Sequence, residues 1–171
     1  MAKKPSYIGL MNAIANGERQ GHDLFRDWCH VTRDEDLKPV LHMVAIREME
    51  HSWAFEKRLN ELGFDLQPSK NAALSKLTKL LKSKADDVEK FAAFGIGTAP
   101  ARDKAPAPAD GLLQILSDQT IDPQTGALMG RFICEERDTG RELNKAYKAL
   151  MRRRSKVKRK KPKKASARKA A

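Results

Sequence analysis

A glutamate and a histidine stand three residues apart on a helical face that is otherwise apolar. The segment IREMEHSWAFEKRLNELG, residues 46–63, contains Glu48 and His51. Steps of three and four residues from Leu41 reach both side chains and then Phe55, so both occupy core positions of one helix. A buried carboxylate without a partner costs free energy, and a metal ion is one partner that removes this cost. The alternative is a hydrogen-bonded core histidine beside a glutamate that pairs with an arginine.

Two further helical segments repeat this pattern. Glu18 is the one acid on the apolar stripe of residues 7–31, and Glu136 interrupts the apolar stripe of the last predicted helix. A register shifted by one residue would place Glu135 inside together with other charged residues, so Glu136 is the better inward candidate. One acid on a core stripe can arise by chance. Three stripes with one glutamate each favour a shared site.

The turn between the first two helices sets their register. Glu18 and Glu48 each stand fifteen residues from Arg33, which falls in the predicted turn. In an antiparallel hairpin each would lie about 22 Å along its helix from the turn, at 1.5 Å per residue. We therefore expect the two glutamates to face each other at one height, with His51 beside them. Together with Glu136 they form either a metal site or a buried polar network.

Three segments carry a resemblance to a known family. ANGERQGHDLF (15–25), the 46–63 segment and FICEERDTGREL (132–143) resemble the ligand helices of the ferritin-like superfamily, in particular its rubrerythrin branch. The resemblance covers residues 7–63 and 124–150. It implies a four-helix bundle with a carboxylate-bridged di-iron site, built from a Glu on each of two helices and a Glu-x-x-His on each of the other two.

The resemblance assigns four ligands to this chain. By position, Glu18 matches the glutamate of the first helix, and Glu48 with His51 matches the first Glu-x-x-His. Glu136 matches the glutamate of the second Glu-x-x-His, whose histidine is replaced by Thr139. The implied cofactor is iron or manganese, as one or two ions, and the missing histidine leaves an empty site open as well.

Three other acids or histidines could complete an altered site. Glu89 is the one glutamate between Glu61 and Glu135, in the part of the chain that would supply the third helix. His22 lies one turn after the first-helix glutamate, and Asp138 lies three residues after Glu135. Each of the three also fits an ordinary exposed helix position.

The elements that must hold these residues are all helical. We expect helices over residues 7–31, from near Pro39 to Leu62, 72–82, 86–94 and from an Asp122 cap to about Met151, with a Pro/Ala-rich linker over 95–110. No segment reads as a strand. The sequence therefore predicts an all-α, ferritin-like four-helix bundle over residues 1–151, with a broken third helix.

The excess positive charge of the chain is concentrated at its C-terminal end. The net charge is +12, and residues 152–171 hold twelve of the 34 Lys and Arg residues and no acid, so the first 151 residues are balanced. This end has almost no apolar residue, and we expect it to be disordered. It predicts sequence-independent binding to DNA or RNA; an anionic lipid surface and a solubilising tail are the alternatives. The residues expected to contact nucleic acid are Arg152, Arg153, Arg154, Lys156, Lys158, Arg159, Lys160, Lys161, Lys163 and Lys164.

The remaining composition indicates a cytoplasmic protein. Cys29 and Cys134 lack any paired spacing, which indicates reduced thiols. No apolar run is long enough to span a bilayer. The N-terminal segment faintly resembles an export signal, but its apolar part is short and interrupted by Asn12, so we expect no export.

Two functions from different classes follow from these patterns. One is a metal-binding protein, in its active form a di-iron carboxylate oxidoreductase or ferroxidase. The other is a non-enzymatic helical scaffold whose basic tail binds nucleic acid. An oxygenase of an organic or tRNA substrate and a homodimer also remain open.

Overall fold

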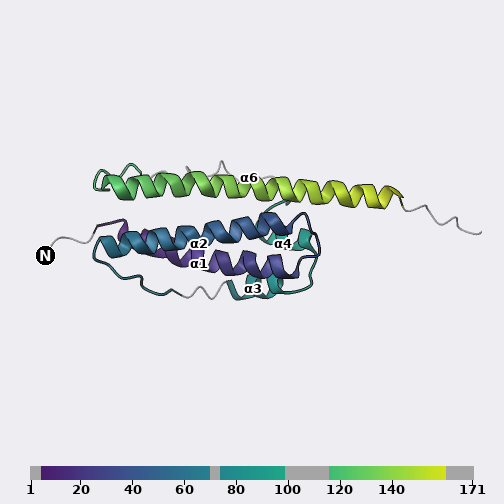
Figure 1. The fold of residues 1–171 in the computed structure, drawn as a ribbon, viewed down its shortest axis with the longest axis horizontal. Coiled ribbons are helices and arrows are strands. Elements are labelled where there is room, and N and C mark those ends of the chain that lie inside the picture. The colour runs from purple at the N-terminus through teal and green to yellow at the C-terminus, as the bar shows by residue number, and fades with distance from the viewer. Residues whose placement is uncertain (1–4, 70–73, 99–115, 161–171) are drawn as a thin grey trace, which may run out of the picture.

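The fold is known from a computed structural model that describes residues 5–69, 74–98 and 116–160, of which 158–160 by their backbone alone. Within these ranges the chain is helical and contains no strand, so the predicted all-α class is confirmed (Figure 1). The helices, labelled as in Figure 1, are α1 (Ile8–Val31), α2 (Lys38–Glu61), α3 (Leu74–Lys82), α4 (Asp87–Ala93) and α6 (Pro123–Lys160).

An antiparallel hairpin of α1 and α2 is the base of the fold (Figure 1). Asp34 holds the turn between them, because its Oδ1 accepts hydrogen bonds from the backbone N–H groups of Asp36 and Leu37, each at 3.1 Å. Both N–H groups belong to the turn that comes directly before α2, and the carboxylate side chain closes this turn in the manner common for Asp. The turn therefore fixes where the middle of α1 meets the middle of α2.

The long helix α6 lies alongside α2 (Figure 1). It begins as predicted, with Pro123 in the first position and the Asp122 carboxylate accepting from the backbone N–H of Thr125 at 2.9 Å. Arg58 of α2 donates to the same carboxylate at 2.8 Å. The Asp122 carboxylate thus caps the first turn of α6 and also joins this turn to α2.

The end of α6 differs from the prediction. The helix does not end near Met151 but continues to Lys160, and Figure 1 shows this end extending past the other helices. The expected disorder of residues 152–171 is therefore wrong for residues 152–160. Residues 161–171 lie outside the described residues.

Ion pairs to the rest of the chain explain why this basic segment continues the helix. Arg153 Nη2 lies 2.6 Å from Asp34 Oδ2, and Arg154 Nη2 lies 2.8 Å from Asp86 Oδ2. Cationic side chains are also favourable near a helix C-terminus, where they meet the negative end of the helix dipole. The composition of residues 152–160 predicted that they would not pack on the rest of the chain, because almost none of them is apolar. In the structure, ion pairs hold this segment in place instead.

Two short helices lie near one end of the hairpin. α3 packs on α1, and Asp86 caps α4 by accepting from the backbone N–H two residues later at 2.7 Å. The buried Lys90 of α4 donates to the Leu81 carbonyl at the end of α3, at 3.0 Å, which joins the two helices. The predicted four-helix arrangement stays a prediction, and most of the expected linker 95–110 lies outside the described residues.

The apolar core forms two clusters rather than one. The turn-side cluster contains Leu24, Phe25, Trp28, Leu37, Leu41, Val44, Ala45, Leu81, Phe91, Leu143 and Leu150. The far-side cluster contains Tyr7, Ile8, Met11, Ile14, Ala15, Phe55, Leu59, Met129, Phe132 and Ile133. Between the two, on all three long helices, stands a polar layer formed by Glu18, Glu48, His51, Glu135, Glu136 and Thr139.

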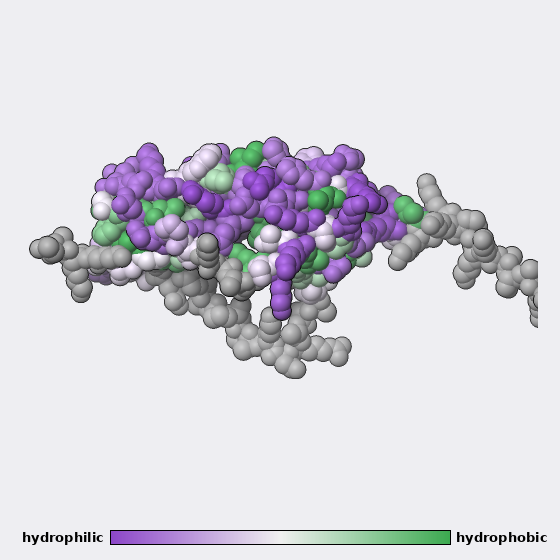
Figure 2. All heavy atoms as spheres, turned by 90° about the horizontal axis from the view of Figure 1, so that it is seen from below, coloured by the Kyte–Doolittle hydropathy of each residue, from purple (hydrophilic) through white to green (hydrophobic). Residues whose placement is uncertain are grey.

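The surface is mainly polar. The face seen in Figure 2 is largely hydrophilic, with small apolar patches among the polar side chains. Among the described helices, none is long and apolar enough to cross a membrane.

Candidate metal centre

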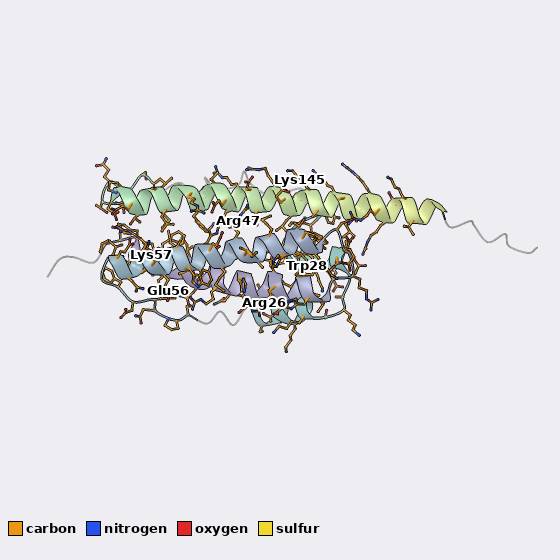
Figure 3. All side chains as sticks on the ribbon, in the orientation of Figure 1. Arg26, Trp28, Arg47, Glu56, Lys57 and Lys145 are labelled. Carbon is orange, nitrogen blue, oxygen red and sulfur yellow. The ribbon has the colours of Figure 1, made fainter. Side chains whose placement is uncertain are left out.

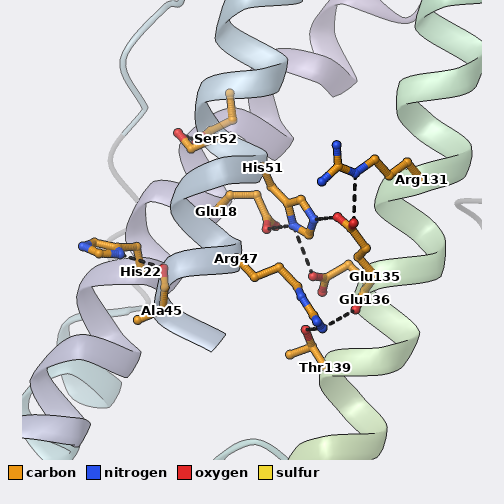
Figure 4. Close-up of polar contacts among 11 residues, drawn as sticks. Glu18, His22, Ala45, Arg47, His51, Ser52, Arg131, Glu135, Glu136 and Thr139 are labelled. Atoms are coloured by element: carbon orange, nitrogen blue, oxygen red, sulfur yellow. Dashed lines mark hydrogen bonds and ion pairs between the residues drawn. The ribbon is translucent and has the colours of Figure 1, made fainter. Parts of the chain in front are cut away.

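The polar layer brings three possible ligands to one point. Glu18 of α1, His51 of α2 and Glu136 of α6 each offer an atom, and these atoms lie within 4.8 Å of one another (Figure 4). His51 Nδ1 is 3.0 Å from Glu18 Oε2 and 3.6 Å from Glu136 Oε1. Two ligands bound to one ion at about 2.1 Å lie about 3.0–3.5 Å apart for angles between about 90° and 109°. The observed spacing is therefore close to that of a coordination sphere.

His51 is held from both sides by carboxylates. Its Nδ1 contacts Glu18, and its Nε2 lies 2.7 Å from Glu135 Oε2 (Figure 4). Burial lowers the pKa of His51, but hydrogen bonds to Glu18 and Glu135 and the negative charges of Glu18 and Glu136 outweigh it, so the pKa is raised. In the metal-free protein the ring therefore favours the imidazolium form, in which both nitrogens donate.

Glu135 is the acid that bridges this histidine to the surface. Its other oxygen, Oε1, accepts from Arg131 Nε at 2.9 Å, one turn away on α6. Burial raises the pKa of Glu135, but the hydrogen bonds from His51 and Arg131 outweigh it and lower the pKa. Glu135 thus stays ionised and stabilises the charged ring.

Glu48 is buried against the backbone of α1. Its residue is 7% exposed, and a Cβ placed on Gly21 would overlap its carboxylate. Burial, followed by the charges of Glu18 and Glu136, raises the pKa of Glu48 to about 9, and the weaker effect of Arg47 does not restore it. Glu48 lies within the polar layer but is not one of the three residues whose atoms converge. At neutral pH it carries a proton.

Glu136 has a buried oxygen, Oε1, that accepts no hydrogen bond within the described part of the chain, although it lies 3.6 Å from His51 Nδ1. Burial, with the charge of Glu18 next, raises the pKa of Glu136. A buried acceptor left unpaired costs about 1–3 kcal/mol, so such an atom is a natural ligand for a cation. The donor set, two carboxylates and an imidazole, fits iron or manganese.

Arg47 contacts Thr139, the residue at the position where the sequence resemblance implied a second histidine. It lies between α2 and α6 (Figure 3), and its Nη1 donates to Thr139 Oγ1 at 2.9 Å and to the Glu135 carbonyl at 3.2 Å. Thr139 is buried and stands three residues after Glu136. A guanidinium group at this position repels a further cation.

The three additional candidates do not join the converging group. His22 Nδ1 lies 2.7 Å from the Ala45 carbonyl of α2, so it fastens the hairpin. Glu89 is exposed on α4, and Asp138 pairs with Arg141 on the surface of α6.

A small cavity reaches the centre from outside. Its volume is about 240 Å³, and its lining includes His51, Trp53, Arg131 and Phe132. Trp53 is 60% exposed, so an indole ring stands beside the opening. His51 is 4% exposed and its Nε2 contacts Glu135 at 2.7 Å, and neither Glu18 nor Glu136 lines this cavity, so the cavity borders the centre at His51 alone.

Three residues of the centre were not predicted from the sequence. Glu135 was passed over for its neighbour, although both contact His51. Arg47 and Gly21 gave two weaker signals: a cation next to a buried glutamate, and a glycine within a helix, where alanine is favoured by about 1 kcal/mol. Both signals become specific only when the two helices are placed side by side.

Comparison with known proteins adds no relative. No family model, curated protein or solved structure matches this chain.

Proposed function

We propose that this chain binds one divalent transition-metal ion, iron or manganese, at the polar layer between its long helices. Glu18, His51 and Glu136 are the ligands, and Glu48 is the nearest further carboxylate. The observation that carries the proposal is the buried Glu136 oxygen, which lacks a hydrogen-bond partner and lies 3.6 Å from His51 Nδ1. A cation there would satisfy it.

The type of ion follows from the ligands. Carboxylate oxygens favour manganese and other hard cations, and one imidazole nitrogen also suits iron. A bound ion of this kind supplies one-electron chemistry toward oxygen or peroxide. The resemblance of the three ligand segments supports a ferritin-like metal protein, in which the cavity that borders His51 would be the approach for a small oxidant. An oxidoreductase or ferroxidase is the activity that this proposal includes.

One ion is favoured over two. A di-iron centre of the ferritin-like type uses a second histidine, and Thr139 stands at that position with the Arg47 guanidinium on it. Two unit charges about 4 Å apart interact by about 4 kcal/mol at the effective dielectric of a protein surface, so Arg47 opposes a second cation there. We therefore propose a site for one metal ion, although the sequence resemblance implies a helix bundle that holds two.

The test is Mn(II) binding by calorimetry and by the loss of the electron-paramagnetic signal of free Mn(II). The parent should bind about one ion per chain. His51→Ala and Glu136→Gln should each weaken binding by about 100-fold or more, since loss of outer contacts alone costs 10–100-fold. His42→Ala, at an exposed histidine of the same helix, is the control and should bind as the parent does. Equal affinity of the His51 and His42 variants would remove the proposal.

A second function, nucleic-acid binding, is favoured by a separate observation. Lys148, Arg152 and Lys156 are exposed on α6, which ends at Lys160, and the sequence of residues 161–171 adds five more Lys or Arg residues. If about six cations contact phosphates, log affinity for duplex DNA should fall against log salt with a slope near −5. Fluorescence anisotropy with labelled duplexes of two unrelated sequences measures this slope. A slope near zero, or strong sequence preference, would contradict it.

A further inference from the structure

Cations on the last part of α6 divide into two faces. The outer face contains Lys148, Arg152 and Lys156, all exposed. Successive members are four residues apart, which in a helix means about 6 Å along the axis and about 40° around it. Within the described residues no carboxylate lies within ion-pairing distance of these three. They form a row of positive charge along one side of α6, and no carboxylate of the described residues pairs with it.

The inner face of the same segment is neutralised. Arg153 and Arg154 lie about 100° and 200° around the helix from Arg152. Arg153 pairs with Asp34 at 2.6 Å and with Asp36 at 3.1 Å, and Arg154 pairs with Asp86 at 2.8 Å. The acids come from the turn between α1 and α2 and from the cap of α4. The positive charges of these two arginines are therefore already paired with carboxylates of the same chain.

The apolar residues of this segment lie away from the outer face. A groove of about 690 Å³ between the end of α6 and the rest of the chain is lined by Leu150, Met151 and Val157 together with polar residues that include Arg153 and Arg154. A helix that binds a lipid surface inserts its apolar side while its cations contact headgroups. Met151 and Val157 are 41% and 59% exposed, so phosphatidylserine vesicles are the competing surface that the test must include.

We propose that the outer face, Lys148 with Arg152 and Lys156, contacts the phosphates of duplex nucleic acid, while Arg153 and Arg154 do not. This inference rests on the second proposed function and assigns its contacts. Phosphates bind exposed cations by releasing counterions, whichever bases they carry. An arginine that is paired with a carboxylate must first give up that ion pair before it can neutralise a phosphate and release the cations condensed on the duplex. Within the described part of the chain, binding therefore involves this one face of α6.

Two charge-matched variants of the full chain test this inference. Arg152→Ala with Lys156→Ala removes two outer cations, and Arg153→Ala with Arg154→Ala removes two inner ones. Loss of two phosphate contacts reduces the salt slope by about 1.8 and the affinity at about 0.1 M salt by about 10- to 60-fold. We expect this for the outer pair, and less than about threefold with an unchanged slope for the inner pair. Arg152→Lys with Lys156→Arg keeps both charges and should bind as the parent does.

Circular dichroism checks that the variants retain the helix content of the parent. Equal losses in the inner and outer variants would overturn the inference, because only the number of charges would then matter, while nucleic-acid binding itself would stand. No binding of the parent to duplex DNA at about 0.05 M salt would instead overturn the proposed nucleic-acid function. Binding to phosphatidylserine vesicles without binding to DNA would overturn both.

Discussion

Replacement of Glu48 by Gln should remove a pH dependence of stability that the metal-free protein shows. Burial raises the pKa of Glu48 from its usual 4.5 to about 9. In the unfolded chain the carboxyl has its ordinary pKa, so between these values the native state binds one proton more. The associated stability is present below the unfolded pKa and is lost as the pH rises through about 9.

The magnitude follows from the number of protons. One proton bound in the native state alone gives a slope of about 1.36 kcal/mol per pH unit. Between about pH 6 and about pH 8 the parent should therefore lose about 2.7 kcal/mol through this group. For a chain of this size 1 kcal/mol changes Tm by about 2–4 °C, so the parent's Tm should fall about 5–10 °C more than that of Glu48→Gln.

The assay is thermal unfolding followed by circular dichroism in the presence of a chelator. His51 and Glu136 also have raised pKa values, so both proteins keep some loss of stability with pH, and only the difference belongs to Glu48. Glu50→Gln, at an exposed glutamate of the same helix, should follow the parent. Parallel Tm curves for the parent and Glu48→Gln would refute the argument that this carboxyl is buried in protonated form.

Three further changes test how the centre is held. Gly21→Ala should destabilise the protein by about 1–3 kcal/mol in urea unfolding, because its Cβ meets the buried glutamate of α2, whereas Gly17→Ala, with open space around it, should stabilise by up to about 1 kcal/mol. Asp122→Ala removes the cap of α6 and should cost about 1–2 kcal/mol in the same measurement; a cost near zero would show that the cap is not needed. Arg47→Ala combined with Thr139→His removes the guanidinium and restores the second histidine, so Mn(II) binding should rise from about one to about two ions per chain; an unchanged ratio would contradict the role given to Arg47.

Residue spacing in the sequence was sufficient to predict the part of the centre that α1 and α2 supply. Glu18 and Glu48 are equally far from the short turn that joins the two helices, which gives them equal heights, and His51, one turn after Glu48, comes within 3.0 Å of Glu18. The apolar residues on either side of them also follow helical spacing, so the two core clusters were implicit in the stripes. This part depends on local geometry, which a sequence expresses directly.

The other half depends on how α6 is rotated against α2. Adjacent residues of a helix point about 100° apart, so Glu136 was expected inside and Glu135 was not. In the structure the helix interface falls between them, and both reach His51. Arg47 crosses to a residue 92 positions away, and no periodicity encodes such a contact. Likewise, composition predicted disorder after Met151 because it does not include ion pairs with distant acids.

The separation of the ligands along the chain has a consequence for the order of folding. Glu18 and His51 are 33 residues apart, but His51 and Glu136 are 85 apart. Closing the longer loop costs roughly 0.8 kcal/mol more, so we expect the hairpin to form first and α6 to dock on it later. An ion held by residues from both parts can bind fully only after that docking. Mn(II) should therefore slow unfolding and leave the refolding rate nearly unchanged. The ion would then stabilise the native state after folding and would not take part in the folding nucleus.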